Sequence, residues 1–113
     1  MRAPVHLNRK LTLEEPVLVQ DGAGGHVETW SEMGVLWANV KPGTGRESAS
    51  EFLTVSSVPY RIVVRGAPVG AASRPRPEQR FREGARIFRI LAVAETDPTG
   101  HYLTCHAREE VTV

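Results

Sequence analysis

The sequence is short of the residues that cross-link small proteins and of the runs that place a chain in a membrane. Its single cysteine, Cys105, cannot form a disulfide within the chain, so packing alone must stabilise the fold. No apolar run approaches the ~20 residues that a membrane helix requires. The first residues lack the apolar stretch of a secretory signal. These absences favour a soluble protein that folds in a reducing cytosol.

Lysine is also scarce, and charge is unevenly distributed along the chain. Twelve of the fourteen basic residues are arginine, and the net charge is +1. Residues 61–89 carry eight arginines and two glutamates, for a net charge of +6. The other residues carry six bases and eleven acids, for a net charge of −5. Such a division suits either a face that binds nucleic acid or subunits that meet through complementary surfaces.

The first half of the chain favours strands. With 113 residues, 41% of them hydrophobic, the chain has the size and composition of one globular domain. Residues 11–19 predict an opening strand in which Pro16 marks an edge position or a bulge. A glycine-rich turn at 21–25 leads to short strands at 27–30 and 35–40, which together form an antiparallel meander.

A long irregular stretch precedes the second set of strands. Residues 43–58 are mostly small and polar, and they predict a long loop or a detached ribbon. Residues 60–65 alternate between apolar side chains on one face and arginines on the other, which predicts a strand. Residues 66–77 predict a flexible surface connection, because their Gly, Ala, Pro, Ser and Arg residues bury little apolar area.

The C-terminal part predicts a turn at 81–84, a strand at 85–93, a turn at 97–100 and a strand at 102–107. No window has a sustained helical period. We therefore predict one mainly β domain over residues 1–113. A small antiparallel β-barrel with a long inserted loop is the favoured architecture, since closure removes exposed strand edges.

Histidine and cysteine near the C-terminus invite a zinc or nucleophile interpretation, which their spacing disfavours. His101 and His106 flank Cys105, whereas a structural zinc site needs about four ligands. Neighbouring side chains of a strand point to opposite faces, so Cys105 and His106 diverge, and no third group is placed to orient a base. A buried thiol flanked by surface imidazoles is the preferred interpretation, with no metal bound.

Two acidic pairs and one glycine-rich turn are weak candidates for chemistry. Glu14 and Glu15, like Glu109 and Glu110, are neighbours whose carboxylates diverge on an extended chain, which favours a solvated surface over acid/base catalysis. Residues 43–46 lack the lysine and the following helix of a phosphate-binding loop, so they favour a strand exit. No residue set supports an enzyme or a cofactor.

An arginine-rich run is the strongest candidate for phosphate contact. Four arginines lie within nine residues on a proline-containing frame: Arg74, Arg76, Arg80 and Arg82. Base stacking would need aromatic residues, and only Phe81 is interleaved. We favour a solvated or subunit-contact loop over direct DNA contact, which would be independent of sequence.

The two tryptophans, Trp30 and Trp37, stand seven residues apart. We predict that they pack in the core or at an interface, because large aromatic rings dominate the packing of both. A platform for carbohydrate or peptide is the less favoured alternative.

A series of short motifs runs along the chain in a recognisable order. They are Leu7 with Arg9-Lys10-Leu11-Thr12-Leu13; Asp21 with Gly24-Gly25; Glu28-Thr29-Trp30; Trp37-Ala38-Asn39-Val40 with Pro42; Gly45-Arg46-Glu47; Tyr60-Arg61-Ile62 with Arg65; Phe81 with Gly84 and Arg86-Ile87-Phe88; and Leu103 with Cys105. Each is weak alone. In this order and spacing, they make nearly the whole chain resemble the head-tail joining proteins of long-tailed phages, also called head closure or stopper proteins.

The resemblance implies a small β-barrel that assembles as a ring, usually six-fold, beneath the portal and adaptor of a DNA-filled capsid. The implied partners are other copies of the chain, the portal or adaptor on the head side, and a tail terminator or tail tube protein on the other side. Packaged double-stranded DNA would pass through the channel without sequence specificity. The implied location is the neck of a virion assembled in the bacterial cytoplasm, with no membrane contact. Both an infectious phage and a gene transfer agent fit.

The resemblance also gives the loop at 43–58 a role, since in such proteins it projects toward the ring axis and helps to close the channel. The residues carried over as the channel loop are Gly45, Arg46, Glu47, Ser48, Ser50, Glu51, Phe52, Leu53 and Thr54. Small side chains suit copies that converge on an axis. We hypothesise that Glu47 or Glu51 forms a collar of negative charge, partly neutralised by Arg46, that disfavours phosphate binding and leaves closure to sterics.

Other functions stay open beside this structural role without catalysis. A tail terminator or an adaptor of the same neck is a close rival. A small β-barrel that binds nucleic acid by itself is another, and it predicts salt-dependent DNA affinity in the isolated monomer. The stretch at 66–77 looks longer and richer in arginine than the family pattern, which leaves its role open.

Overall fold

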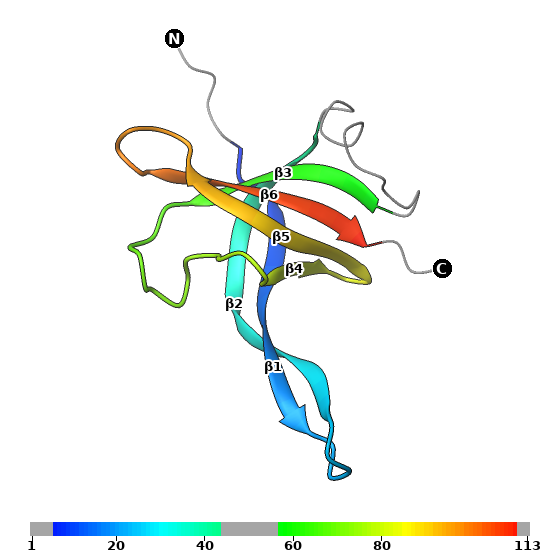
Figure 1. Ribbon diagram of the computed structural model, residues 1–113. Helices are drawn as coiled ribbons and strands as arrows, with labels where there is room; N and C mark the ends of the chain where they lie inside the picture. Colours follow the sequence, from blue (N-terminus) through cyan, green and yellow to red (C-terminus); the bar gives the residue numbers. More distant parts are fainter. Residues whose placement is uncertain (1–5, 44–56, 111–113) are drawn as a thin grey trace.

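Six strands form one closed antiparallel barrel in the computed structural model, which describes residues 6–43 and 57–110 (Figure 1). The strands are β1 (Arg9–Gln20), β2 (His26–Pro42), β3 (Ser57–Arg65), β4 (Arg80–Glu83), β5 (Arg86–Glu95) and β6 (Tyr102–Glu110). They are neighbours in the order β1-β2-β3-β6-β5-β4, and β4 pairs back onto β1 to close the ring of strands. The predicted mainly β barrel is confirmed.

The strands β1 and β2 form one long hairpin. The prediction of two short strands at 27–30 and 35–40 is therefore wrong. β2 runs unbroken from His26 to Pro42 and pairs with β1 along its length. The irregularity falls at Gly34, whose φ of 149° favours glycine, opposite a register shift between Leu13 and Glu14. A β-bulge therefore accommodates the register shift, and β2 continues through it as one strand.

Pro16 occupies the edge position that the sequence predicts, but the bulge lies earlier in the strand. β4 pairs with β1 only from Thr12 to Glu14, so Pro16 has β2 on one side and no strand on the other. A missing N–H costs no ladder hydrogen bond at such an open edge.

The remaining strands confirm the alternation predicted for residues 60–65 and correct two boundaries. β3 begins at Ser57, so the loop predicted at 43–58 ends two residues earlier than expected; residues 44–56, which include every channel-loop candidate, lie outside the described residues. The turn predicted at 81–84 is wrong, because Arg80–Glu83 forms strand β4 and the chain reverses at Gly84, whose φ is 60°.

Alternation along every strand fills the barrel with apolar side chains. Ile62 and Val64 of β3 are fully buried, whereas Arg61 and Arg65 of the same strand are exposed. The ring of Tyr60 packs edge to face on that of Phe88, with centroids 5.2 Å apart. The buried core consists of Leu11, Leu13, Ala38, Ile62, Val64, Phe81, Phe88, Ile90, Leu103, Cys105 and Ala107.

The connection at 66–77, predicted to be flexible, contains turns held by backbone hydrogen bonds. The amides of Ala71 and Arg74 donate to the carbonyls of Pro68 and Ala71, both at 3.0 Å. Pro75 is fully buried despite the polar composition around it. The flexibility of this segment stays a prediction.

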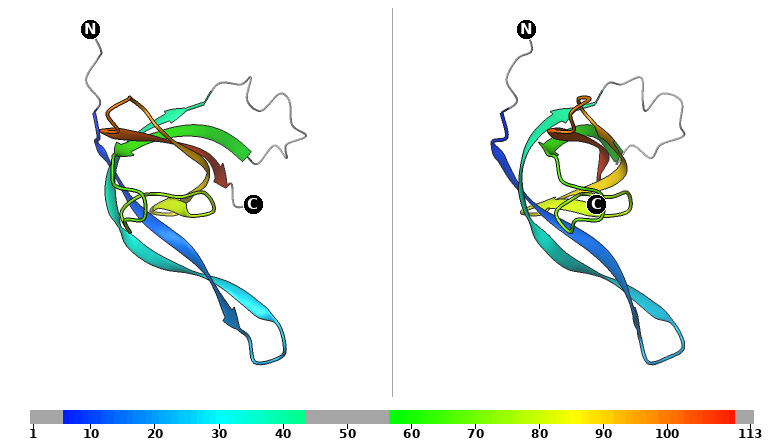
Figure 2. Two further views of the ribbon diagram at one scale, coloured as in Figure 1. Left: turned by 60° about the vertical axis from the view of Figure 1, so that its left-hand side comes forward. Right: turned by 90° about the vertical axis from the view of Figure 1, so that its left-hand side faces the viewer.

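The half of the β1–β2 hairpin nearest its turn projects from the barrel (Figure 2). We call residues 15–33 the arm; it begins where β1 loses its pairing with β4. The molecule is accordingly elongated, with extents of 58 × 34 × 24 Å. Within the described residues, only the turn at 21–25 connects the two strands of the arm, and no third strand pairs with them there.

Candidate functional site

A buried carboxylate on the outer side of the barrel organises the arginine-rich run. Glu14 lies directly opposite Arg80 on β4, and its side chain is only 8% exposed. Its two oxygens accept hydrogen bonds from Nε of Arg80 at 2.7 Å and from Nε of Arg82 at 2.9 Å. The expectation of a solvated Glu14 is therefore wrong, because two guanidinium groups cover it.

The pKa of Glu14 follows from two opposed effects. Burial alone would raise the pKa of this carboxyl group, because it disfavours the charged form. The hydrogen bonds from Arg82 and Arg80 outweigh burial, so the pKa lies below its ordinary value. Glu14 is therefore a fixed negative charge that joins β1 to β4, and it is not a proton donor for catalysis near neutral pH.

The other two arginines of the run are also held by neighbouring elements. Arg76 forms an ion pair with Glu15 of β1. Arg74 donates from Nη1 to the carbonyl of Ala67 at 2.9 Å, which ties the two parts of the β3–β4 connection together. All four arginines that the sequence singled out thus have a partner within the chain, and three of them pair with the two carboxylates of β1, Glu14 and Glu15.

Neither tryptophan lies in the core, so that half of the prediction is wrong. Trp30, on β2, stacks against the guanidinium of Arg80, whose Cζ is 4.0 Å from the ring centroid. Trp37 is 55% exposed on the outer side of β2, beside Lys10 of β1. Trp37 alternates with the buried Ala38 and so faces away from the barrel interior, whereas Trp30 lies in the arm between exposed residues. An interface role for them stays a prediction.

A second charged group, the ionic cluster, sits at one end of the barrel interior and consists of Arg9, Glu83, Arg86 and Glu109. Arg9 binds Glu83 through two hydrogen bonds, at 2.7 and 2.5 Å. Arg86 binds Glu109 through two more, at 2.7 and 3.1 Å, and also donates to the hydroxyl of Tyr60 at 3.2 Å. The guanidinium of Arg86 lies 4.9 Å from the ring centroid of Phe88.

Hydrogen bonding sets the charge state of this ionic cluster. The hydrogen bond from Arg86 lowers the pKa of Glu109, and that from Arg9 lowers the pKa of Glu83. The same bonds raise the pKa of Arg86 and Arg9. The four groups therefore form a stable set of ion pairs that covers this end of the apolar core.

The ionic cluster lies where the predicted channel loop joins the barrel. Tyr60, which binds Arg86, is paired with Pro42 at the end of β2. The amide of Gly43 donates to the carbonyl of Pro59 at 2.8 Å, which fixes the two strands on either side of the loop. The same end carries the last residues of β6, seen at the right in Figure 1.

The sequence carried a signal for the ionic cluster that our interpretation missed. Glu109 alternates with the buried Cys105 and Ala107, and Arg86 alternates with the buried Phe88 and Ile90. Charged residues on the inward line of two neighbouring strands indicate ion pairing at the end of a barrel. The expectation that Glu109 is a solvated surface carboxylate is wrong for this reason.

The C-terminal thiol and its neighbouring histidine occupy different environments. Cys105 is fully buried in the core, and burial raises its pKa to about 12. The thiol therefore stays protonated near neutral pH and is a poor nucleophile. His101 is exposed on a turn. In residues 6–43 and 57–110, no group of three or more His, Cys, Asp and Glu side chains could hold a metal ion.

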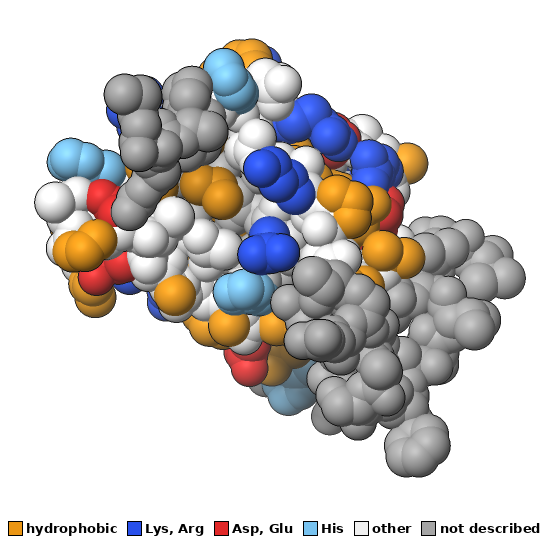
Figure 3. Space-filling model, turned by 90° about the horizontal axis from the view of Figure 1, so that it is seen from above, with side chains coloured by type: hydrophobic (Ala, Val, Ile, Leu, Met, Phe, Trp, Pro, Cys, Tyr) orange, Lys and Arg blue, Asp and Glu red, His pale blue; other side chains and the backbone are white. Residues whose placement is uncertain are grey.

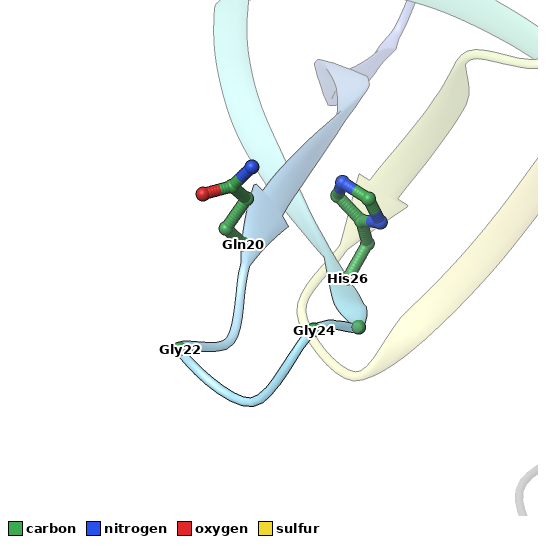
Figure 4. Close-up of a pocket in the computed structure, with 5 residues that line it drawn as sticks. Gln20, Gly22, Gly24 and His26 are labelled. Carbon is green, nitrogen blue, oxygen red and sulfur yellow. The ribbon is translucent and has the colours of Figure 1, made fainter.

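Two shallow hollows are lined by described residues, and neither resembles an active site. One, of about 210 Å³, lies at the tip of the arm, between Gln20 and His26 and over the glycine backbone of the turn (Figure 4). The other, of about 230 Å³, lies between β1 and the β3–β4 connection and is lined by Glu15, Arg76 and Gln79 among others. Gln79 accepts a hydrogen bond from the amide of Arg76 at 2.7 Å, while its buried Nε2 has no partner among the described groups.

The described part of the chain contains no helix long and apolar enough to cross a membrane. Most charged groups of the ionic cluster and of the arginine-rich run pair with one another, and the hollows described above bring no catalytic pair together. The fold is a small closed β-barrel with a projecting two-stranded arm.

The particular family follows from comparison with known proteins. Residues 2–110 match the model of the phage head completion protein family, so the chain belongs to that family. A chain in the virion of a native gene transfer agent particle is 68% identical, with 96% of this chain and 98% of that chain covered and a TM-score of 0.78. No curated protein matches the chain.

A more distant structure shares the fold. The solution structure of protein SF1141 from Shigella flexneri 2a is 24% identical, covers 91% of this chain and 92% of its own, and has a TM-score of 0.62. The resemblance to head closure proteins is thus confirmed at the level of the family. The chain is therefore a member of the phage head completion proteins, and its 68% identical neighbour is part of a virion.

Proposed function

We propose that the chain closes the filled head of a phage-like particle as a ring in the neck, with head proteins on one side and the tail on the other. The observation that carries this proposal is the 68% identity, over 96% of the chain, to a chain of a gene transfer agent virion. A protein that completes a head must lie where DNA enters, since that opening remains after packaging. The same likeness favours a particle of the gene transfer agent type.

The loop at 43–58 is proposed to close the channel by its bulk, with Glu47 or Glu51 supplying a collar of negative charge. The ionic cluster supports this role, because a loop under pressure from packaged DNA needs a fixed base. Arg86 links β3, β5 and β6 at that base through Tyr60 and Glu109. Force on the loop would thus be spread over the barrel.

DNA retention tests the loop directly. Particles are assembled with a chain that lacks residues 48–57, and the DNA content of filled heads is measured after purification. We expect heads that fill and then lose their DNA. A matched control changes Glu47→Gln and Glu51→Gln at full loop length, and retention should persist if closure is steric. Normal retention in the deletion variant would rule the loop out as the plug.

Electron microscopy of the particle neck tests the ring itself. The expected result is a ring of this chain between the adaptor and the tail. Density for the chain directly on the end of the tail tube, or directly against the portal, would reassign it to the rival terminator or adaptor role.

The arginine-rich run supports this assembly role over independent DNA binding. Arg80 and Arg82 are occupied by Glu14, and Arg76 by Glu15, so these guanidinium groups have carboxylate partners already. The isolated chain should therefore show weak DNA affinity that does not change when Arg74, Arg76 and Arg80 are replaced by alanine. A steep salt-dependent affinity that these changes abolish would favour the nucleic-acid-binding alternative.

A further inference from the structure

The arm exposes apolar side chains and open strand edges that its own chain leaves uncovered. Leu18 is 70% exposed, and Val17, Val19 and Val27 beside it are also exposed. A two-stranded ribbon is marginally stable alone in water, and unpaired strand edges favour contact with another chain. The arm is therefore a surface that a partner would stabilise.

The charge of the arm is of one sign. Residues 15–33 contain four acids, Glu15, Asp21, Glu28 and Glu32, and no lysine or arginine. Glu15 is paired with Arg76, whereas Glu28 and Glu32 are exposed and form no ion pair with any described side chain. Leu18 lies directly opposite Glu28, so one face of the arm combines an apolar centre with acidic groups.

A face of opposite charge lies on the outer side of the barrel, over the end of β2, β3 and β6. We call Lys41, Arg61, Arg65 and Arg108 the basic face. Lys41 lies directly opposite Arg61, and Arg61 lies directly opposite His106. No described acidic side chain is within ion-pair distance of Lys41, Arg61 or Arg65. Figure 3, which looks down on this side of the barrel, shows basic side chains gathered there.

Like charges directly opposite one another destabilise a sheet, so the basic face is unfavourable in the isolated chain. One acid adjoins it: Glu110, at the end of β6, pairs with Arg89 at 3.6 Å. Between Pro59 and Arg65, the outward residues of β3 are otherwise apolar or basic. A partner that brings carboxylates and an apolar side chain to this face would remove the repulsion.

The arm and the basic face lie on opposite sides of the barrel. The arm projects below it in Figures 1 and 2, while β3 lies above. The two surfaces therefore cannot meet within one chain. The arm extends six residues of β1 beyond Glu14, about 20 Å at the rise of an extended strand, which is comparable to the thickness of a neighbouring barrel.

We propose that the arm of one subunit lies across the basic face of the next copy of this chain, with Glu28 and Glu32 against Lys41 and Arg61 and with Leu18 in the contact. Such a contact joins two different surfaces, so it repeats head to tail, and it closes into a ring when the rotation permits. This inference rests on the proposed ring and names the contact that builds it.

Charge reversal in assembled particles tests the contact. The arm variant is Glu28→Lys with Glu32→Lys, and the face variant is Lys41→Glu with Arg61→Glu. We expect each to lower the amount of this chain in purified particles by about tenfold, and the combined variant to restore it, because the reversed charges attract again. The matched control, Glu78→Lys with Glu95→Lys, makes the same charge change on exposed residues away from the arm and should have no effect.

Thermal unfolding of each isolated variant separates folding from assembly. All four target residues are exposed, so the unfolding midpoints should match that of the natural chain. Three results would overturn the inference. The arm and face variants could each leave the amount of the chain in particles unchanged, or the combined variant could fail to restore it. The third is that only the face variant lowers this amount and that it also loses DNA binding. A ring that persists in all variants would remove this contact and leave the proposed function standing. Absence of any ring of the natural chain would remove both.

Discussion

The barrel and the arm are built from the same two strands, yet their side chains meet opposite surroundings. In the barrel half, Leu11 and Leu13 of β1 are fully buried beneath β4 and the rest of the ring of strands. In the arm, Val17 and Val19 continue the same alternation and are exposed. The difference is the neighbour: β4 covers β1 only as far as Glu14. Burial here depends on which strand lies alongside, and not on the hydrophobicity of the residue.

The largest expected effect breaks the barrel. Phe81→Ala removes a fully buried ring from β4, and it should lower the free energy of unfolding by about 3–5 kcal/mol. Chemical denaturation of the purified variant measures this loss. A loss below about 1 kcal/mol would mean that the interior collapses around the deletion, and that the core is looser than its burial indicates.

A smaller loss is expected at the junction between barrel and arm. Glu14→Gln leaves Arg80 and Arg82 without their shared carboxylate, and it should cost about 1–3 kcal/mol in the free energy of unfolding. The control is Glu15→Gln in the next position, whose pair with Arg76 is more exposed, and it should cost at most about 1 kcal/mol. Equal losses at the two positions would contradict the special role of Glu14.

Acid should weaken the barrel through its carboxylates. The folded-state pKa values of Glu14, Glu83 and Glu109 lie below the ordinary value of 4.5. Their ionised forms therefore stabilise the fold above that pH, and the stabilisation is lost as pH falls through the lowered values. The unfolding midpoint should stay level at neutral pH and fall in the acid range. In the Glu14→Gln variant, the unfolding midpoint should fall less steeply as the pH is lowered. An unchanged slope would show that Glu14 does not contribute to the loss of stability in acid.

The smallest effect on stability is expected in the arm. Leu18→Ser replaces an exposed side chain, so the free energy of unfolding should change by no more than about 0.5 kcal/mol. The same variant should reduce incorporation of the chain into particles, since Leu18 lies in the proposed contact. Denaturation together with quantification of the chain in particles separates these effects. A large loss of stability would show that the arm packs against its own barrel.

The period of two in the sequence was sufficient to predict strands and inward faces where the chain is regular, as at residues 60–65. It failed where pairing with a neighbouring strand determined the local structure. Two short strands were predicted at 27–30 and 35–40, but the pairing with β1 carries β2 through a bulge next to Gly34. A turn was predicted at 81–84, but Arg80–Glu83 forms a strand that pairs with β1 on one side and β5 on the other.

The candidate site shows the same limit at individual residues. The arginine run was visible in the sequence, but its partners Glu14 and Glu15 lie more than sixty positions away. Trp30 was predicted to pack in the core or at an interface because of its size, and its contact in the structure is the guanidinium of Arg80 on another strand. Long-range pairing of this kind cannot be inferred from spacing along one chain.

The order of motifs along the sequence determined the family, the mainly β class and the absence of disulfide stabilisation, because these depend on residue types and their local alternation. Only the tertiary structure decided which charges are paired, which apolar residues are exposed, and that the acidic arm and the basic face lie on opposite sides of one barrel. The physical reason is strand pairing between segments distant in sequence, which sets burial and charge contact together.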